Sequence, residues 1–362
     1  MTTGALITVD DAALAHNVAT LRSLVGDTAL MVVVKAGAYG HGAVGSALAF
    51  ERAGVDRLGV ADLDEAVALR RAGVTVPLLA WLHAPGETFE RAVEHDVTPA
   101  VSDLAQLEAA AAAGCPTVHL CVDTGLHRNG AVEPEWAALF ARAAQLSDRT
   151  VVEGLMSHLA NTSEAEDAAQ AASFERATEA ARAAGLDPRL RHLSASAAVL
   201  DRPALRYDMV RVGLAAYGLS PVAGRSSAEL GLRPALTLTA PVTTVKRVRA
   251  GEGVSYGYVF RPEADTTVVI VPLGYADGLD RAASDRAAVT IAGRRHRVRG
   301  RIAMNALVVD VGDAPVSVGD EVVLLGDPAA GHVGAEEWAE AQGGITYEVV
   351  TCLSHRIERT HA

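Results

Sequence analysis

Ala29-Leu30-Met31-Val32-Val33-Val34-Lys35 is the most apolar stretch near the N-terminus, and it ends on a lysine. The chain holds one other lysine, Lys246, and every other one of its 32 Lys+Arg positions is arginine. An arginine stays charged at any biological pH, whereas a lysine amine can lose its proton and attack a carbonyl. The stretch therefore predicts a buried strand that ends either on a reactive amine or on an ordinary lysine whose stem reaches water.

The same alternation of a short apolar strand and an amphipathic helix repeats from residue 10 to about residue 230. The expected strands are 29–35, 57–61, 77–82, 97–101, 117–123, 152–159, 190–195 and 209–215. Helical patterns lie between them, with Asp62 and Ser102 as expected N-caps. Eight such units predict an α/β fold, a (β/α)8 TIM barrel over residues 1–232. The alternative is an open doubly wound sheet, but segment 35–42 lacks the glycine fingerprint of that fold.

The pattern changes after residue 232. Val- and Thr-rich runs are separated by Gly, Pro and Asp turns, with little helical pattern before 334–342. The runs are 235–248, 266–272, 288–292, 307–311 and 321–325. They predict a mainly β C-terminal domain over residues 233–362. The opening strand 5–9 is expected to pair with the barrel.

The composition excludes several classes of partner. The formal net charge is -12 and the pI is near 5.5, so we expect no nucleic-acid or anionic-membrane surface. The N-terminus shows no signal peptide, and no apolar run is long enough to span a membrane. The spacing of Cys115, Cys121 and Cys352 fits neither a disulfide framework nor a metal site. We therefore expect a cytoplasmic protein without a metal.

Catalytic residues of such barrels lie at the C-terminal ends of the strands. The polar, glycine or ionisable residues at these ends are Lys35, Tyr39, Asp123, Arg128, His158, Ser196, Arg211 and Gly213. Together they offer an amine, an imidazole, two guanidinium groups and backbone N–H donors, a set that suits a phosphorylated aldehyde cofactor. The alternative is that each residue is structural, with His158 as a core histidine and Ser196 as a helix cap. His41, His83, His119 and His127 are interpreted as structural.

Motifs along the whole chain resemble one family. The segment Val34-Lys35-Ala36-Gly37-Ala38-Tyr39-Gly40-His41-Gly42 resembles the pyridoxal-phosphate attachment motif of alanine racemases. Further matches follow in order at 122–130, 157–160, 210–214, 254–257, 274–278, 300–304 and 346–349. The resemblance implies a barrel followed by a β domain, pyridoxal 5'-phosphate as cofactor, and a homodimer whose subunits pack head to tail.

The resemblance also implies two bases. Lys35 would hold the cofactor through its amine and then act as one base. Tyr256, in the β domain, would be the opposing base and reach into the active site of the partner subunit. Racemisation needs two bases on opposite faces of one carbon. His158 and Arg211 would stabilise the Tyr256 phenolate, and Arg211 would also face the cofactor's ring nitrogen.

The resemblance also implies which residues bind the cofactor phosphate and the substrate. The cofactor phosphate would be held by the hydroxyls of Tyr39, Ser196 and Tyr347 and by the N–H groups of Gly213 and Leu214. Arg128 and the backbone N–H of Met304 would bind the substrate carboxylate, and Tyr275 would lie at the pocket mouth. The implied activity is the interconversion of L- and D-alanine, which supplies D-alanine for peptidoglycan.

The chain departs from the family pattern at four places inside these motifs. Cys121 stands where many relatives have a lysine, often carbamylated, that orients the arginine equivalent to Arg128. Gly37 and Ala195 each replace a usual asparagine, and Asn305-Ala306 replaces a common Asp-Gln pair. An alanine racemase remains the leading prediction, beside two alternatives: a racemase or decarboxylase of the same fold for another amino acid, or a non-catalytic pyridoxal-phosphate carrier.

Overall fold

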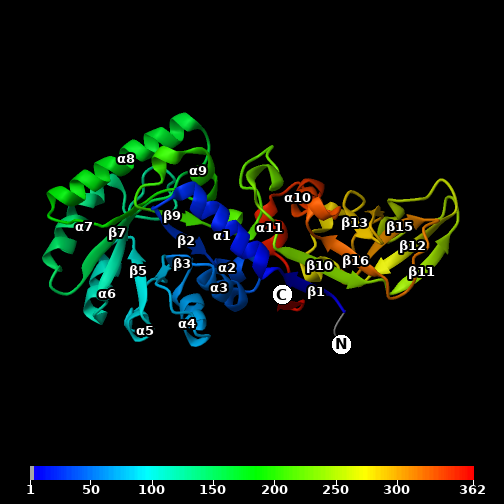
Figure 1. The fold of residues 1–362 in the computed structure, drawn as a ribbon, viewed down its shortest axis with the longest axis horizontal. Helices are drawn as coiled ribbons and strands as arrows, with labels where there is room; N and C mark the ends of the chain where they lie inside the picture. The colour runs from blue at the N-terminus through cyan, green and yellow to red at the C-terminus, as the bar shows by residue number, and fades with distance from the viewer. Residues whose placement is uncertain (1–3) are drawn as a thin grey trace.

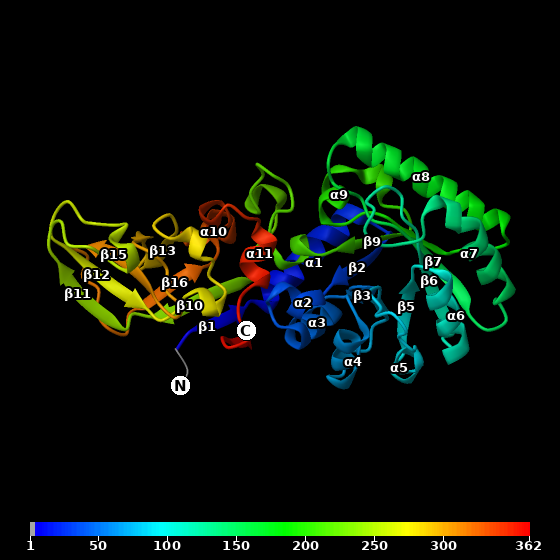
Figure 2. The ribbon, with the colours of Figure 1, turned by 180° about the vertical axis from the view of Figure 1, so that it is seen from behind.

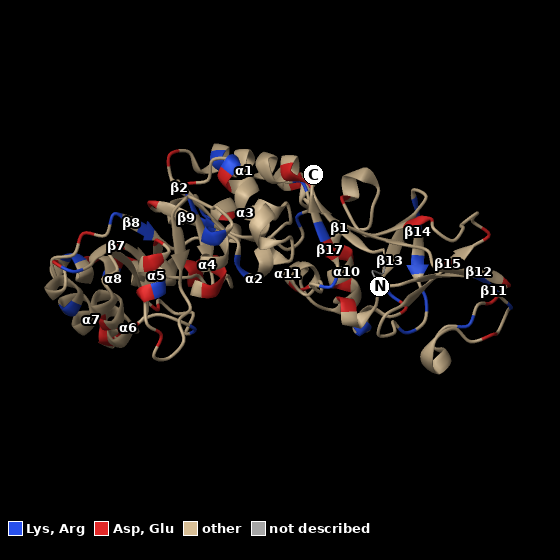
Figure 3. Ribbon diagram, turned by 90° about the horizontal axis from the view of Figure 1, so that it is seen from below, with Lys and Arg blue, Asp and Glu red and all other residues tan. Residues whose placement is uncertain are grey.

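The structure is a computed structural model that describes residues 4–362. It has two units along its long axis (Figures 1 and 2), a helix-covered barrel at one end and a β-sheet unit at the other. Helix α11 and the C-terminus lie between them. Charged residues of both signs occur on both units (Figure 3). Among the helices within residues 4–362, none is both long and apolar enough to cross a membrane.

The first unit is built on eight parallel strands in the order β8-β7-β6-β5-β4-β3-β2-β9. They are β2 (Ala29–Val33), β3 (Arg57–Val60), β4 (Leu78–Ala80), β5 (Val97–Val101), β6 (Thr117–Cys121), β7 (Val151–Met156), β8 (Leu190–His192) and β9 (Met209–Val212). A bridge between Ala195 and Arg211 closes the two ends of the sheet. The predicted (β/α)8 barrel is confirmed, although most strands end earlier than the apolar runs suggested.

Helices surround the barrel as the alternation predicts. They are α1 (Asp11–Val25), α3 (Ala43–Arg52), α4 (Leu63–Arg71), α5 (Glu90–Glu94), α6 (Leu104–Ala113), α7 (Glu133–Gln145), α8 (Glu164–Ala183) and α9 (Ser196–Asp201). Asp62 caps α4 by accepting from the N–H of Glu65. The predicted cap at Ser102 is wrong, because Asp103 caps α6 through the N–H of Gln106. An aspartate three residues before a free N–H has the right reach for this bond.

The segment labelled α2 (Lys35–Tyr39) is not a right-handed helix. Ala36, Gly37, Ala38 and Tyr39 all have positive φ angles, of 54°, 64°, 55° and 53°. The turn is closed by bonds such as Gly42 N–H to Gly37 O at 2.8 Å. The chain therefore leaves the first barrel strand in a left-handed turn that places Lys35 and Tyr39 on its two ends.

The second unit is a nine-stranded sheet in the order β11-β12-β15-β14-β13-β16-β10-β1-β17. Its strands are β1 (Leu6–Val9), β10 (Leu236–Pro241), β11 (Thr244–Val248), β12 (Thr266–Val271), β13 (Ala288–Ile291), β14 (Arg294–Val298), β15 (Leu307–Gly312), β16 (Glu321–Leu325) and β17 (Glu358–His361). Helices α10 (Ala335–Gln342) and α11 (Thr346–Thr351) complete it. The mainly β C-terminal domain is confirmed.

The expected pairing of the opening strand with the barrel is wrong. β1 pairs antiparallel with β10 and parallel with β17, so both ends of the chain lie in the second sheet. The barrel is already closed by its own eight strands and has no free edge for a ninth.

The two units pack closely beside the left-handed turn. A Cβ on Gly40 would lie 1.9 Å from the carbonyl oxygen of Val350 in α11, so α2 and α11 touch through backbone. Arg359 in β17 donates from Nε to Gly40 O at 2.8 Å. This contact brings Tyr347 of α11 beside Tyr39, with ring centroids 6.1 Å apart.

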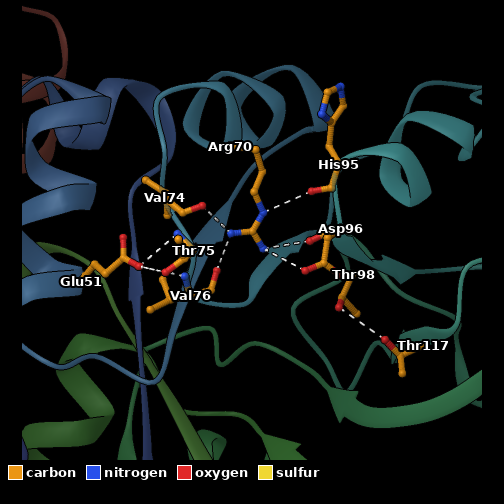
Figure 4. Close-up of polar contacts among 9 residues, drawn as sticks. All are labelled: Glu51, Arg70, Val74, Thr75, Val76, His95, Asp96, Thr98 and Thr117. Atoms are coloured by element: carbon orange, nitrogen blue, oxygen red, sulfur yellow. Dashed lines mark hydrogen bonds and ion pairs between the residues drawn. The ribbon is translucent and has the colours of Figure 1, made fainter.

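One partly buried arginine joins two connections at the N-terminal end of the barrel (Figure 4). Arg70, in the last turn of α4, donates to four backbone carbonyls on the connections that lead into β4 and β5. The acceptors are Val74 at 2.9 Å, Val76 at 2.7 Å, His95 at 3.2 Å and Asp96 at 2.9 Å. The connections at the end opposite the catalytic residues are therefore fixed by a single side chain.

Candidate active site

Lys35 follows β2 directly and is half-buried. Its Nζ lies 5.9 Å from the ring centroid of Trp81. Burial lowers the pKa of Lys35, the charges of Arg128 and Arg211 lower it further, and Glu65 opposes them. An amine that loses its proton more readily is the nucleophile that covalent attachment of an aldehyde requires.

Glu65 is a site residue that the sequence did not reveal. Its Oε1 accepts from the N–H of Ala36 at 2.6 Å, and its Oε2 accepts from the N–H of Ala61 at 2.8 Å. The carboxylate therefore holds the start of the left-handed turn against the end of β3. Its role was hidden because a glutamate in the first turn of α4 reads as an ordinary exposed helix residue.

Arg211 is buried at the end of β9, with only 4% of its surface exposed. One guanidinium nitrogen donates to Ser157 O at 2.6 Å and to His158 Nδ1 at 3.1 Å. The other donates to His192 O at 2.7 Å and to His192 Nδ1 at 3.0 Å. Burial lowers the pKa of Arg211 to about 10, so the side chain is still a cation at neutral pH. Arg211 is therefore a charged donor that is held in a fixed position inside the barrel.

His158 is a neutral imidazole, and its hydrogen bond with Arg211 fixes which ring nitrogen carries the proton. Burial, followed by the charges of Arg211, Arg128 and Lys35, lowers the pKa of His158 to about 3. A guanidinium can only donate, so His158 Nδ1 accepts from Arg211 and the ring proton lies on Nε2. The Nε2–H group is then available to a partner from outside the barrel.

The predicted phosphate-binding residues form a compact cradle. A Cβ on Gly213 would lie 2.2 Å from the hydroxyl oxygen of Tyr39, so only glycine lets that hydroxyl reach the backbone. Ser196 Oγ accepts from the N–H groups of Gly213 at 2.9 Å and of Ala215 at 3.5 Å. With its oxygen so engaged, Ser196 can donate its own proton to an anion.

The remaining cradle groups are also donors. Burial raises the pKa of both Tyr39 and Tyr347, so their hydroxyls stay protonated. Leu214 begins the 3-10 turn Leu214–Tyr217, and its N–H therefore has no intrahelical acceptor. Hydroxyl and backbone donors beside a lysine of lowered pKa fit the phosphate and aldehyde groups of pyridoxal 5'-phosphate.

Three predicted site residues lie apart from this cluster, in the second unit. Tyr256, Tyr275 and Met304 are 70%, 43% and 55% exposed. The N–H of Ala276 donates to Met304 O at 2.9 Å, which places Tyr275 and Met304 side by side. Within residues 4–362, no hydrogen bond joins any of the three to the barrel. The structure thus brings the predicted residues together in two groups rather than one.

Tyr256 lies on a strained, exposed turn. Ser255, Gly257 and Tyr258 have φ angles of 60°, 72° and 46°. The Ser255 hydroxyl donates to Arg301 O at 2.7 Å and fixes this turn to the segment that carries Met304. Non-glycine residues with positive φ cluster at functional sites, because the surrounding structure must offset their cost.

The departures from the family pattern have different structural settings. Cys121 is buried in an apolar cluster with Met31 and Met156, and burial raises its pKa to about 11, so it is a neutral thiol. Arg128 is exposed, and no residue within 4–362 forms a hydrogen bond with it. Ala195 forms the bridge that closes the barrel. Cys121, as a neutral thiol, therefore cannot hold the Arg128 guanidinium as a carboxylate would.

Comparisons with known proteins agree with this arrangement. Residues 9–221 match the family model "Alanine racemase, N-terminal domain", and residues 235–361 match "Alanine racemase, C-terminal domain". The alanine racemase of Mycolicibacterium vanbaalenii is 48% identical over 98% of this chain and 93% of its own length. That of Salinispora arenicola is 46% identical over 98% and 97%.

Solved structures give the same result. The alanine racemase from D-cycloserine-producing Streptomyces lavendulae superposes with a TM-score of 0.97 at 40% identity, over 100% of this chain and 98% of its own. The Streptomyces coelicolor A3(2) alanine racemase gives 0.96 at 41% identity, over 99% and 98%. Both units of the present chain are covered in these matches. The chain belongs to the alanine racemase family.

Proposed function

We propose that this protein is a pyridoxal-phosphate-dependent alanine racemase that works in the cytoplasm and supplies D-alanine for peptidoglycan. Residues 1–232 would bind the cofactor, and residues 233–362 would complete the site. The observation that carries this proposal is the barrel cluster itself: Lys35 with a lowered pKa, beside a cradle of donors and the buried cation of Arg211. Family membership gives this cluster its chemistry.

The cofactor, when bound, supplies an electron sink for the negative charge that develops on the substrate Cα. Lys35 would hold it, with the phosphate on the hydroxyls of Tyr39, Ser196 and Tyr347 and the N–H of Leu214. The N–H of Gly213, which donates to Ser196 Oγ at 2.9 Å, would share that bond with the phosphate. The Lys35 amine takes or returns a proton on one face of the Cα. Its lowered pKa makes the neutral, accepting form available.

Arg211 has two tasks in this proposal. As a permanent cation it would face the cofactor's ring nitrogen and leave that nitrogen unprotonated, which limits side reactions. It also holds His158 with the ring proton on Nε2. That N–H would donate to the Tyr256 phenolate and stabilise it, so that Tyr256 can accept a proton on the second face of the Cα.

In this proposal Tyr256 would come from a second subunit. It is exposed and has no hydrogen bond to the barrel within residues 4–362, yet a racemase needs a base on each face of the substrate. A head-to-tail homodimer solves this by placing Tyr256, Tyr275 and Met304 of one subunit over the barrel of the other. The exposed apolar surface of these residues would then be covered.

The substrate carboxylate would bind Arg128 and the N–H of Met304. Because Cys121 gives Arg128 no charged anchor, a second candidate is a racemase of the same fold that prefers another amino acid. A freer Arg128 could accept a carboxylate in more than one position.

A racemisation assay over a panel of L-amino acids tests the proposal. We expect alanine to be the preferred substrate and Lys35→Ala to abolish both racemisation and the visible absorbance of the bound cofactor. Lys246→Ala is the matched control, because Lys246 is the only other lysine and is exposed on β11. A colourless, inactive wild type would contradict the proposal, and turnover of another amino acid alone would establish the second candidate.

A further inference from the structure

A continuous chain of hydrogen bonds runs from Arg211 through the inside of the barrel to its opposite end. Arg211 donates to His192 Nδ1 at 3.0 Å, and His192 Nε2 lies 2.8 Å from His119 Nδ1. His119 Nε2 lies 3.2 Å from Glu153 Oε2. Glu153 in turn accepts two bonds from Arg57, at 2.6 Å and 3.0 Å. The chain thus links the site to the first residues of strands β3 and β7.

The chemistry of the two ends fixes the direction of every bond. Arg211 can only donate, so His192 Nδ1 must accept and its ring proton lies on Nε2. His192 therefore donates to His119 Nδ1, which leaves the proton of His119 on Nε2. That proton meets the Glu153 carboxylate, which can only accept. From Arg211 to His119, every N–H in this series of bonds points away from the active site and toward Glu153.

The barrel interior is shaped for this chain. His119 and His192 are fully buried, and a Cβ on Gly154 would lie only 2.4 Å from His119 Nδ1. Any side chain at Gly154 would therefore displace the His119 ring. Two unpaired imidazoles in such a place would each cost the desolvation of a polar group, and a fully satisfied chain avoids that cost.

Burial is the main reason that both imidazoles are neutral. It lowers the pKa of His119 and of His192, and the cations of Arg211 and Arg57 lower both further, while the Glu153 carboxylate opposes the shift at His119. The bond from His119, followed by those from Arg57, lowers the pKa of Glu153 to about 2 despite its partial burial. At neutral pH the Glu153 carboxylate is therefore ionised, and the rings of His119 and His192 each carry one proton.

We propose that Glu153 is a positioning residue for the racemase reaction, acting through His119 and His192 on the guanidinium of Arg211. This rests on the function proposed above, in which Arg211 faces the cofactor. The carboxylate at one end and Arg211 at the other together fix the tautomers of both rings, and the His192 Nδ1 lone pair then holds the plane of the guanidinium. His119, interpreted from the sequence as structural, becomes part of the catalytic support.

Nitrogen NMR of the wild-type protein with ¹⁵N-labelled histidine tests the direction of the chain without any assay of turnover. We expect His119 and His192 to be neutral with the proton on Nε2 from pH 8 down to pH 5. The resonances are assigned by their loss in His119→Gln and His192→Gln. A proton on Nδ1 of either ring would overturn the proposal, whether or not the protein racemises alanine.

Glu153→Gln tests the effect on the reaction. An amide can present either oxygen or N–H₂ to His119, so only the Arg211 end still opposes reversal, and each reversed set of bonds points an N–H of His192 at the Arg211 guanidinium and displaces it. We expect kcat to fall about tenfold, equivalent to ~1.4 kcal/mol, with KM changed less than about twofold. The NMR spectrum should show a mixture of tautomers. Unchanged kcat and unchanged tautomers in a folded variant would overturn the proposal.

Arg57→Gln tests the same loss of the Glu153 charge, here by protonation of Glu153 as the pH is lowered. Without Arg57 the pKa of Glu153 rises, because the remaining bond from His119 no longer has a cation beside it. The ratio of variant to wild-type kcat should be near one at pH 8 and should fall between about pH 6 and pH 4 as Glu153 protonates. A ratio that stays flat would contradict the proposal. Glu108→Gln, in the exposed pair with Arg142, is the control and should match wild type throughout.

Discussion

The four residues after Lys35 carry the clearest local strain in the molecule. Ala36, Ala38 and Tyr39 have Cβ atoms in left-handed conformations, which cost ~1–2 kcal/mol per residue. The cost is offset by the bond from Ala36 N–H to Glu65 and by the packing of Gly40 on α11. The turn holds the attachment lysine and one cradle hydroxyl in fixed positions before a ligand binds, which is what preorganisation requires.

Glycine at position 36 should therefore be tolerated. Ala36 is exposed, so Ala36→Gly loses no packing, and it relieves a strain of ~1–2 kcal/mol while raising the entropy of the unfolded chain by ~0.4–1 kcal/mol. We expect stability against urea to stay the same or rise by up to ~1 kcal/mol. The control is Ala172→Gly on the exposed face of α8, which should lose ~1 kcal/mol. Equal losses in both variants would show that the turn is right-handed.

The single-residue scale also explains why Lys35 could be found and Glu65 could not. Lys35 stands out because lysine is otherwise almost replaced by arginine, and because it follows an apolar run. Glu65 acts through two backbone N–H groups on other elements, and such bonds leave no trace in composition or spacing. Likewise His119 was interpreted as structural and His192 was not singled out, since only the fold brings their ring nitrogens within 2.8 Å.

At the scale of elements, the spacing of apolar residues and the positions of turn residues predicted the barrel well. Each apolar run became a parallel strand, because strands covered by helices on one face and core on the other need no polar alternation. The C-terminal ends of the strands were predicted too far along the chain. The predicted strand 152–159, for example, extends past β7 (Val151–Met156), because the residues around the site residue His158 continue the pattern after strand pairing has ended. The place of β1 could not be read from the chain, because strand partners are set by distant segments.

Arg70 shows how one side chain can hold several elements. Lysine at this position could reach only part of the four carbonyls, because an ammonium lacks the planar fork of a guanidinium. We expect Arg70→Lys to lose ~1–2 kcal/mol of unfolding free energy in urea, since partly buried carbonyls would be left without donors. The neighbouring exposed Arg71 is the control, and Arg71→Lys should change stability by less than ~0.5 kcal/mol.

The Arg70 variant also separates stability from catalysis. Its contacts lie on the connections into β4 and β5, at the N-terminal ends of these strands (Figure 4), whereas Lys35 and Arg211 lie at the C-terminal ends of β2 and β9. At temperatures where Arg70→Lys is folded, its kcat should therefore equal that of wild type. A loss of kcat without unfolding would mean that this end of the barrel supports the site in a way that Arg70 controls.

At the scale of the whole molecule, the predicted site residues form two groups, called half-sites below, one on each unit. The barrel group holds the amine, the cradle and Arg211, and the second unit holds Tyr256, Tyr275 and Met304 on an exposed surface. Membership of the alanine racemase family and the fold follow from the chain itself. The way in which the half-sites meet depends on a second subunit, and that stays a prediction.

A hybrid dimer can decide whether Tyr256 acts across the interface. Co-expression of Lys35→Ala and Tyr256→Phe chains with different affinity tags allows the heterodimer to be purified. If the bases come from different subunits, one of its two sites pairs Lys35 of one chain with Tyr256 of the other. It should then show about half the wild-type activity, although both parent homodimers are inactive or nearly so.

The matched control replaces the second chain by the double variant Lys35→Ala/Tyr256→Phe. That heterodimer has no barrel with Lys35, so neither arrangement of subunits gives an intact site and it should be inactive. If Tyr256 instead served its own barrel, the first heterodimer would be inactive too, because each of its chains lacks one base. Activity recovered only in the first hybrid therefore requires that the two faces of the substrate are served by two different chains.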